Sequence, residues 1–109
     1  MQGEIPALSI GDFAALRSGP QPYALLDVRE PWEVALGALP EALTIPMNEL
    51  PDRLETLPAD RPLVVLCHHG QRSAHVTAWL HKHGYDKAVN LEGGIDAWAR
   101  TVDPAMPTY

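Results

Sequence analysis

The chain has 109 residues, of which 46% are apolar and 20% are charged, and these values are typical of one globular domain rather than a disordered or fibrous protein. Its 14 acidic residues outnumber its 8 lysines and arginines, and the resulting net charge of −6 argues against a nucleic-acid or anionic-membrane partner. No apolar stretch approaches the ~20 residues that a membrane-spanning helix needs.

The single cysteine, Cys67, cannot form an internal disulfide. The residues from Met1 to Pro6 show neither the basic region nor the apolar run of a signal peptide. We therefore expect a cytoplasmic protein.

The first predicted helix begins at a capping-box pattern. Ser9 is placed to cap the helix, Asp12 stands at its third position, and Leu8 precedes the cap as the apolar staple. We expect the helix to run to about Arg17 and to stop at residues 18–20, Ser-Gly-Pro.

A buried strand is predicted at residues 24–28, and it ends in polar side chains. Asp27 and Arg29 lie at its carboxyl end, where open α/β sheets place their ligand crevices. Alternatively, these two residues pair as a structural clasp, a common use of polar residues at the end of a strand. Pro31 suits the first position of a short helix that we expect to end at Leu36.

A short strand at residues 42–45 and another helix are predicted next. Leu50, Leu54 and Leu57 recur at helical spacing, and Asn48 is a suitable cap. We expect this helix to contribute packing rather than function.

The stretch 63–73 carries the candidate chemistry. A strand of apolar residues ends at Cys67, and a short loop leads into a helix that we expect over residues 72–83, with Gly84 as its stop. The first turn of a helix has unpaired N–H groups and the positive end of the helix dipole, so this junction suits an anion. A cysteine at this place is favoured as the thiolate, which is the nucleophilic form.

The loop after the strand has further features of an anion site. Gly70 permits a tight backbone turn, and Arg72 offers guanidinium donors at the helix start. The alternative is that Cys67 is an inert buried residue. We take Cys67 as the candidate nucleophile, and the candidate binding residues are those of the loop: His68, His69, Gly70, Gln71, Arg72 and Ser73.

The histidines raise the question of a metal. All 5 lie between residues 68 and 83, but their spacing to Cys67 matches no paired Cys/His zinc pattern, and we expect no metal. A loop whose N–H groups point inward turns many side chains outward. We therefore place His68 and His69 at the mouth of the site rather than in proton transfer.

The remaining chain predicts a strand at 88–91, a turn at Gly93-Gly94 and a helix over 95–100 anchored by Trp98. The prolines that follow make the tail irregular. The alternation of strands and helices implies an α/β fold with a mainly parallel sheet. In such a sheet the loops after successive strands share one edge.

Three segments in this order resemble the single-domain form of the rhodanese (thiosulfate sulfurtransferase) family. They are residues 25–33 (LLDVREPWE), 67–73 (CHHGQRS) and 90–98 (NLEGGIDAW). The resemblance implies one three-layer α/β domain of the rhodanese-like kind over residues 1–109, with helices on both faces of the central sheet. Its core would lie at about 9–98, and residues 101–109 would form an irregular tail.

The family resemblance also implies roles. Cys67 would carry sulfane sulfur as a persulfide held by the loop backbone through Ser73, Arg72 would help bind the anionic donor, and Asp27 and Arg29 would be mainly structural. The expected partners are a thiosulfate-like donor and a thiol acceptor, for instance a thioredoxin. The resemblance implies no metal and no organic cofactor.

The chain departs from the family pattern at two places. It has Gly-Ala-Leu at 37–39 where members often have Gly-His-Ile, and Glu41 replaces the usual glycine. In related phosphatases the arginine follows the cysteine by six positions, whereas Arg72 follows Cys67 by five, and the shorter loop favours sulfur transfer. A phosphatase or arsenate reductase is thereby disfavoured, and a non-catalytic binding module or sulfur-relay carrier is the remaining alternative.

Overall fold

The computed structural model describes residues 5–109, so most of the segment used for the signal-peptide prediction lies outside the described residues. Its centre is a five-stranded sheet in the order β1-β5-β4-β2-β3, and every strand pairing is parallel. The strands are β1 Ala7–Leu8, β2 Ala24–Asp27, β3 Leu43–Thr44, β4 Leu63–Leu66 and β5 Ala88–Leu91.

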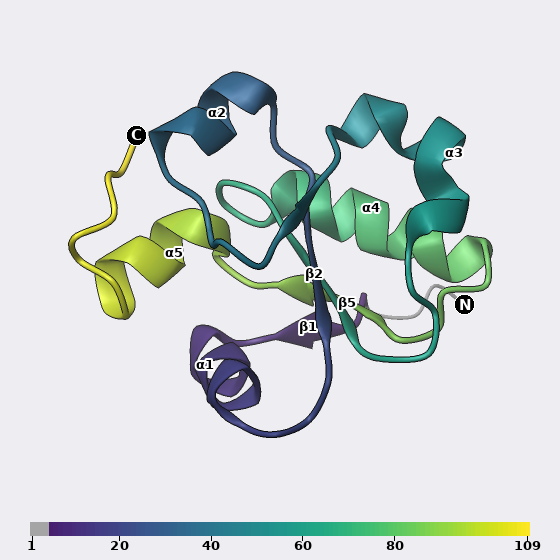
Figure 1. Ribbon diagram of the computed structural model, residues 1–109, viewed down its shortest axis with the longest axis horizontal. Helices are drawn as coiled ribbons and strands as arrows, with labels where there is room; N and C mark the ends of the chain where they lie inside the picture. Colours follow the sequence, from purple (N-terminus) through teal and green to yellow (C-terminus); the bar gives the residue numbers. More distant parts are fainter. Residues whose placement is uncertain (1–4) are drawn as a thin grey trace.

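Helices cover both faces of this sheet, which confirms the predicted three-layer α/β fold (Figure 1). Helices α2, α3 and α4 lie on one side, and α1 and α5 lie on the other. The helices are α1 Ile10–Ser18, α2 Pro31–Leu36, α3 Leu50–Arg53, α4 Gln71–Lys82 and α5 Gly94–Thr101. Within residues 5–109, none of these helices has the length and apolar content needed to span a bilayer.

The central strand β4 is buried on both faces because helices cover both. Its side chains alternate between two apolar cores, as the two-residue period of a strand requires. Leu63 and Val65 pack in the core beneath α3 and α4, and Val64 and Leu66 pack in the core against α1 and α5.

The start of α1 confirms the predicted cap, because Ser9 Oγ accepts a hydrogen bond of 3.0 Å from the backbone N–H of Asp12. The two-residue strand β1 just before it was not predicted from the sequence. Its residues pair with Asn90 and Leu91 of β5, and a strand this short leaves no alternation to detect.

The predicted helix through Leu50, Leu54 and Leu57 is wrong in form. The segment is a single α-helical turn between two 3₁₀ turns, Met47–Glu49 and Leu54–Thr56, and Asn48 caps no helix. The phenolic group of Tyr85 donates a hydrogen bond to the carbonyl of Leu54, and this carbonyl therefore has a partner outside any continuous helix.

The parallel topology places the carboxyl ends of the strands at one edge of the sheet. Just beyond β2, the backbone N–H of Val28 bonds to the carbonyl of Leu66, the last residue of β4, so the loop after β2 starts beside the loop after β4. The loop after β5 lies on the other side of the β4 loop, because strand β5 pairs with β4. The predicted meeting of these loops is confirmed.

Candidate active site

The sulfur of Cys67 lies at the amino-terminal end of α4. It accepts hydrogen bonds from the backbone N–H groups of Gly70, at 3.1 Å, and Ser73, at 3.4 Å, and the Ser73 hydroxyl lies 3.3 Å away. Ser73 is the third residue of α4, so its N–H is one of those that a helix start leaves unpaired. Cys67 is only 1% exposed, and its sulfur lies at the junction of strand, loop and helix where the sequence places the candidate anion site.

Helix α5 explains why the loop turns its N–H groups toward the sulfur. The carbonyls of Cys67 and His68 point the other way and accept hydrogen bonds from the N–H groups of Ile95 and Asp96, at 2.9 and 3.1 Å. These N–H groups belong to the first turn of α5. The start of α5 therefore holds the loop carbonyls, while the start of α4 donates an N–H group to the sulfur. Gly94 leaves no side chain between them, since a Cβ there would overlap both carbonyls.

Asn90 of β5 is a site residue that we did not single out from the sequence. Its Nδ2 donates to the carbonyl of Gly70 at 3.2 Å, and its Oδ1 accepts the hydroxyl of Ser73. A polar side chain in an otherwise apolar strand was the available signal, because buried amides are almost always hydrogen-bonded. The single hydroxyl proton of Ser73 is therefore shared between two acceptors, Asn90 Oδ1 and Cys67 Sγ.

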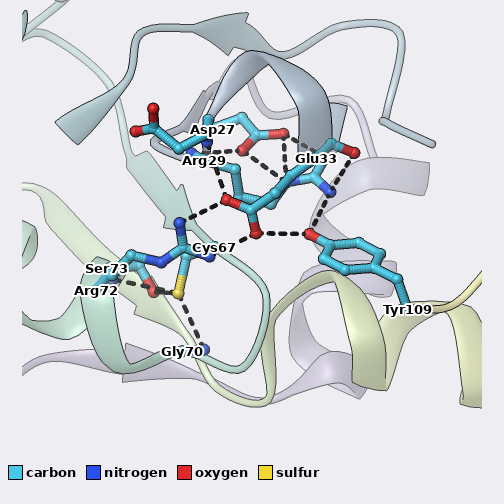
Figure 2. A network of polar contacts seen from close by, with 9 residues as sticks. Asp27, Arg29, Glu33, Cys67, Gly70, Arg72, Ser73 and Tyr109 are labelled. Atoms are coloured by element: carbon cyan, nitrogen blue, oxygen red, sulfur yellow. Dashed lines mark hydrogen bonds and ion pairs between the residues drawn. The ribbon is translucent and has the colours of Figure 1, made fainter. Parts of the chain in front are cut away.

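Arg72 forms a bidentate ion pair with Glu33 of α2. Its Nη1 and Nη2 lie 2.6 and 2.7 Å from the two carboxylate oxygens (Figure 2). The carboxylate also accepts the N–H of Glu30 at 3.0 Å and the hydroxyl of Tyr109 at 2.9 Å. The hydrogen bonds from Arg72 are the largest cause that lowers the pKa of Glu33 to about 2, and the pair raises the pKa of Arg72.

This ion pair changes the role that Arg72 can have at the site. The sequence suggested a free cation for the donor anion, whereas in the structure Glu33 compensates the charge of Arg72. The side chain of Glu33 is 5% exposed and that of Arg72 is 33% exposed. Glu33 falls inside the segment 25–33, but nothing in its spacing predicted a partner 39 residues away.

Asp27 and Arg29 form a fully buried ion pair, with Nη2 of the arginine 2.8 Å from the aspartate. Arg29 also donates to the carbonyl of Gly37 and to the hydroxyl of Tyr109. The structural clasp was the alternative that the sequence offered, and these contacts are those of a clasp. Figure 2 shows the pair joined through Tyr109 to Glu33 rather than directed at Cys67.

The other loop side chains lie at the rim. His68 stacks between the rings of His69 and Tyr109, with ring centroids 4.1 and 3.9 Å away. Burial, followed by the neighbouring His69, lowers the pKa of His68. His69 and Gln71 are exposed. Tyr109 was predicted only as part of an irregular tail, and no local pattern signals its place over the loop.

The clustered histidines raise the question of a metal site that includes Cys67 as a ligand. In the structure, the candidate metal-binding group among residues 5–109 is instead His68, His69 and Asp96, whose ligand atoms lie within 4.8 Å of one another. The two imidazoles are nearly parallel, 19° apart, so their lone pairs do not converge on one point. Asp96 is also paired with Arg100 at 3.0 Å, and the group therefore fits a tetrahedral zinc site poorly.

The chain is similar to known proteins over most of its length. Residues 9–101 match the family model described as a rhodanese-like domain. A sulfurtransferase of Allochromatium vinosum is 46% identical over 76 residues, which cover 70% of this chain and 71% of that protein. A putative sulfurtransferase of Bacillus subtilis, YtwF, is 44% identical, covering 73% and 77%. The crystal structure of a rhodanese-like domain protein from Staphylococcus aureus superposes with a TM-score of 0.83, at 30% identity, covering 96% and 99%.

Proposed function

Because this chain belongs to the rhodanese-like domain family, we propose that it is a sulfurtransferase that carries sulfane sulfur on Cys67 as a persulfide. The observation that carries the proposal is the sulfur of Cys67 at the start of α4, with the N–H groups of Gly70 and Ser73 directed at it. The two relatives that bear the name sulfurtransferase support the reaction class.

In the first step, the Cys67 thiolate attacks the outer sulfur of a donor such as thiosulfate. The S–S bond of the donor breaks, sulfite leaves with the bonding electron pair, and a new S–S bond joins the transferred sulfur to Sγ. The negative charge then resides on the outer sulfur of the persulfide, where the N–H groups of the loop and the start of α4 stabilise it.

In the second step, a thiolate acceptor attacks the outer sulfur and the Cys67 thiolate departs, which restores the starting enzyme. The acceptor that we propose is a cellular thiol, for instance that of a thioredoxin, and cyanide would serve in an assay. The sulfite product leaves before the acceptor reacts, so the kinetics are ping-pong. A reducing compartment such as the cytoplasm suits a free nucleophilic cysteine.

The mass of the intact protein tests this proposal. After incubation with thiosulfate or an organic persulfide and removal of the donor, the wild-type mass increases by one sulfur, and the Cys67→Ser variant shows no increase. Circular dichroism of the variant checks that it folds. An unmodified wild-type mass with every donor would contradict the persulfide carrier and favour a non-catalytic binding module.

A further inference from the structure

We propose that Glu33 sets the donor class of this site by occupying Arg72, so that the loop takes small organic persulfides, R–S–SH, in preference to the thiosulfate dianion. This inference rests on the proposed sulfur transfer at Cys67. It assigns Glu33 the role of a specificity-determining residue, which acts on the donor through Arg72.

The contacts of Arg72 are the first argument. A guanidinium binds two oxygens of an oxyanion through paired N–H groups, and in this structure the Glu33 carboxylate already takes one bond from each terminal nitrogen, at 2.6 and 2.7 Å. A thiosulfate sulfonate would have to use the remaining N–H groups of Arg72 while lying beside the carboxylate charge.

Glu33 is also firmly held. Besides Arg72, the carboxylate accepts the N–H of Glu30 and the hydroxyl of Tyr109, which fills its four acceptor positions. An incoming anion that displaced Arg72 would leave a carboxylate that is 5% exposed without its countercharge, which is costly. The pKa of about 2 keeps Glu33 charged at neutral pH.

The surrounding charges give no compensation to a dianion. Asp27 pairs with Arg29, and Asp96 pairs with Arg100, so the arginines that the described contacts place around the loop are each matched by a carboxylate. The chain as a whole carries a net charge of −6. An organic persulfide with no sulfonate avoids most of this repulsion and of the desolvation cost.

The aromatic rings beside the loop suit an organic group. The Trp32 side chain is exposed over most of its surface, and its ring meets that of Tyr109 with centroids 5.9 Å apart. Tyr109 in turn lies against His68 of the loop. These rings give the R group of an organic donor an apolar surface, which the small thiosulfate ion cannot use.

The proposed step is balanced. The Cys67 thiolate attacks the outer sulfur of R–S–SH, the donor S–S bond breaks, and R–S⁻ leaves with the electron pair. The proton stays on the transferred sulfur, which becomes the outer sulfur of Cys67–S–SH. No external oxidant or reductant takes part.

The variant Glu33→Gln tests the inference, with thiosulfate and the persulfide of 2-mercaptoethanol as donors. In the wild type, kcat/KM for the persulfide should exceed that for thiosulfate by at least about tenfold. Freeing the charge of Arg72 in Glu33→Gln should lower the KM for thiosulfate by about fivefold and leave the KM for the persulfide within about twofold.

Glu41→Gln is the matched control. Glu41 is likewise held by an arginine and a tyrosine, since Arg17 Nε and the hydroxyl of Tyr23 lie 2.7 and 2.6 Å from it, but its partners are not in the loop. The control makes the same change in net charge and should leave the KM for thiosulfate unchanged. An equal fall in both variants would overturn the role of Glu33 in favour of a general charge effect.

The wild type keeps the inference testable if Glu33→Gln does not fold, because a kcat/KM for thiosulfate equal to or above that for the persulfide overturns it. An unchanged or raised KM for thiosulfate in folded Glu33→Gln likewise overturns the inference while the mass increase on Cys67 still supports sulfur transfer. Absence of that increase with both donors instead defeats the proposed function itself.

Discussion

At the scale of single residues, the sulfur of Cys67 is stabilised by a few hydrogen-bond donors, and one of them, the Ser73 hydroxyl, also has a second acceptor. Ser73 has one hydroxyl proton for two acceptors, and Asn90 holds that hydroxyl from the neighbouring strand. When the sulfur becomes a thiolate or a persulfide anion, the hydroxyl can turn its proton from Asn90 Oδ1 to the sulfur. Ser73 therefore supplies a donor that responds to the charge on the sulfur.

Replacing Ser73 by alanine removes this donor and should slow persulfide formation by roughly 10- to 150-fold, because a hydrogen bond to a charged group contributes roughly 1.5–3 kcal/mol. The measurement is the single-turnover rate of the mass increase with a persulfide donor. Thr77→Val is the control, since the Thr77 hydroxyl bonds only the backbone carbonyl of Ser73 among the contacts seen. Equal rates in wild type and Ser73→Ala would refute a role for the hydroxyl.

The ionised Glu33 carboxylate makes the stability of the fold depend on pH. The pKa of the Glu33 carboxyl is 4.5 in the unfolded chain and about 2 in the folded protein, so the stabilisation by Arg72 is complete above pH 4.5 and is lost as the pH falls toward 2. Allowing for the part-exposed Arg72, the loss should be about 2–3 kcal/mol. Urea unfolding between pH 5 and 2 should show this extra loss in the wild type and not in Glu33→Gln. Parallel curves for the two proteins would contradict it.

At the scale of elements, two helix starts are arranged around one loop. The first turn of α4 directs the N–H of Ser73 to the sulfur, and the first turn of α5 binds the carbonyls of Cys67 and His68. The loop is thus fixed from both sides by backbone groups. The Gly93-Gly94 turn, predicted as a turn rather than a phosphate-binding loop, lets α5 approach closely enough to make these bonds.

Gly94→Ala should therefore be far more damaging than an ordinary glycine substitution. The new Cβ would overlap the backbone carbonyls of Cys67 and His68, so the loop or α5 must move. Gly84→Ala is the matched control, because Gly84 also has a positive φ, of 91°, but no heavy atom within 4 Å of an added Cβ.

The control should lose about 1–2 kcal/mol from the left-handed backbone alone, and Gly94→Ala should lose at least about 3 kcal/mol together with most persulfide formation. Guanidinium unfolding and the rate of the mass increase give the two measurements. If both variants lost the same stability, the clamp of α5 on the loop would not contribute.

At the scale of the whole molecule, the net charge of −6 sets the field that an anionic donor meets. Like charges repel, and dissolved salt screens this repulsion over a Debye length of about 10 Å at 0.1 M. The local cations offer little relief, since Arg72 and Arg29 are each paired with a carboxylate. Repulsion of a dianion should therefore weaken as salt is added.

For thiosulfate, kcat/KM should rise severalfold between about 0.02 and 0.3 M of an inert salt, because screening removes part of the repulsion. The rate at which uncharged iodoacetamide alkylates Cys67 provides the control and should change little. A fall of kcat/KM with salt would mean that a net positive site attracts the donor, which would contradict the charge compensation of Arg72.

The sequence alone determined the features that depend on neighbouring residues. Helix caps, turn glycines and apolar strands act over a few positions, so Ser9, the Gly93-Gly94 turn and the strand into Cys67 were all predicted. The alternation of elements predicted an α/β fold with a mainly parallel sheet. The place of Cys67 beside the start of α4 was predicted for the same reason, since a helix start leaves its N–H groups free wherever it occurs.

Only the tertiary structure decided which side chains become partners across the fold. Glu33 meets Arg72 from 39 positions away, and Tyr109 reaches Glu33 from 76 positions away. An ion pair depends on distance in space, and no local spacing records which carboxylate will face a given arginine. Arg72 could therefore be predicted as a cation beside Cys67, whereas the compensation of its charge by Glu33 is a property of the folded chain.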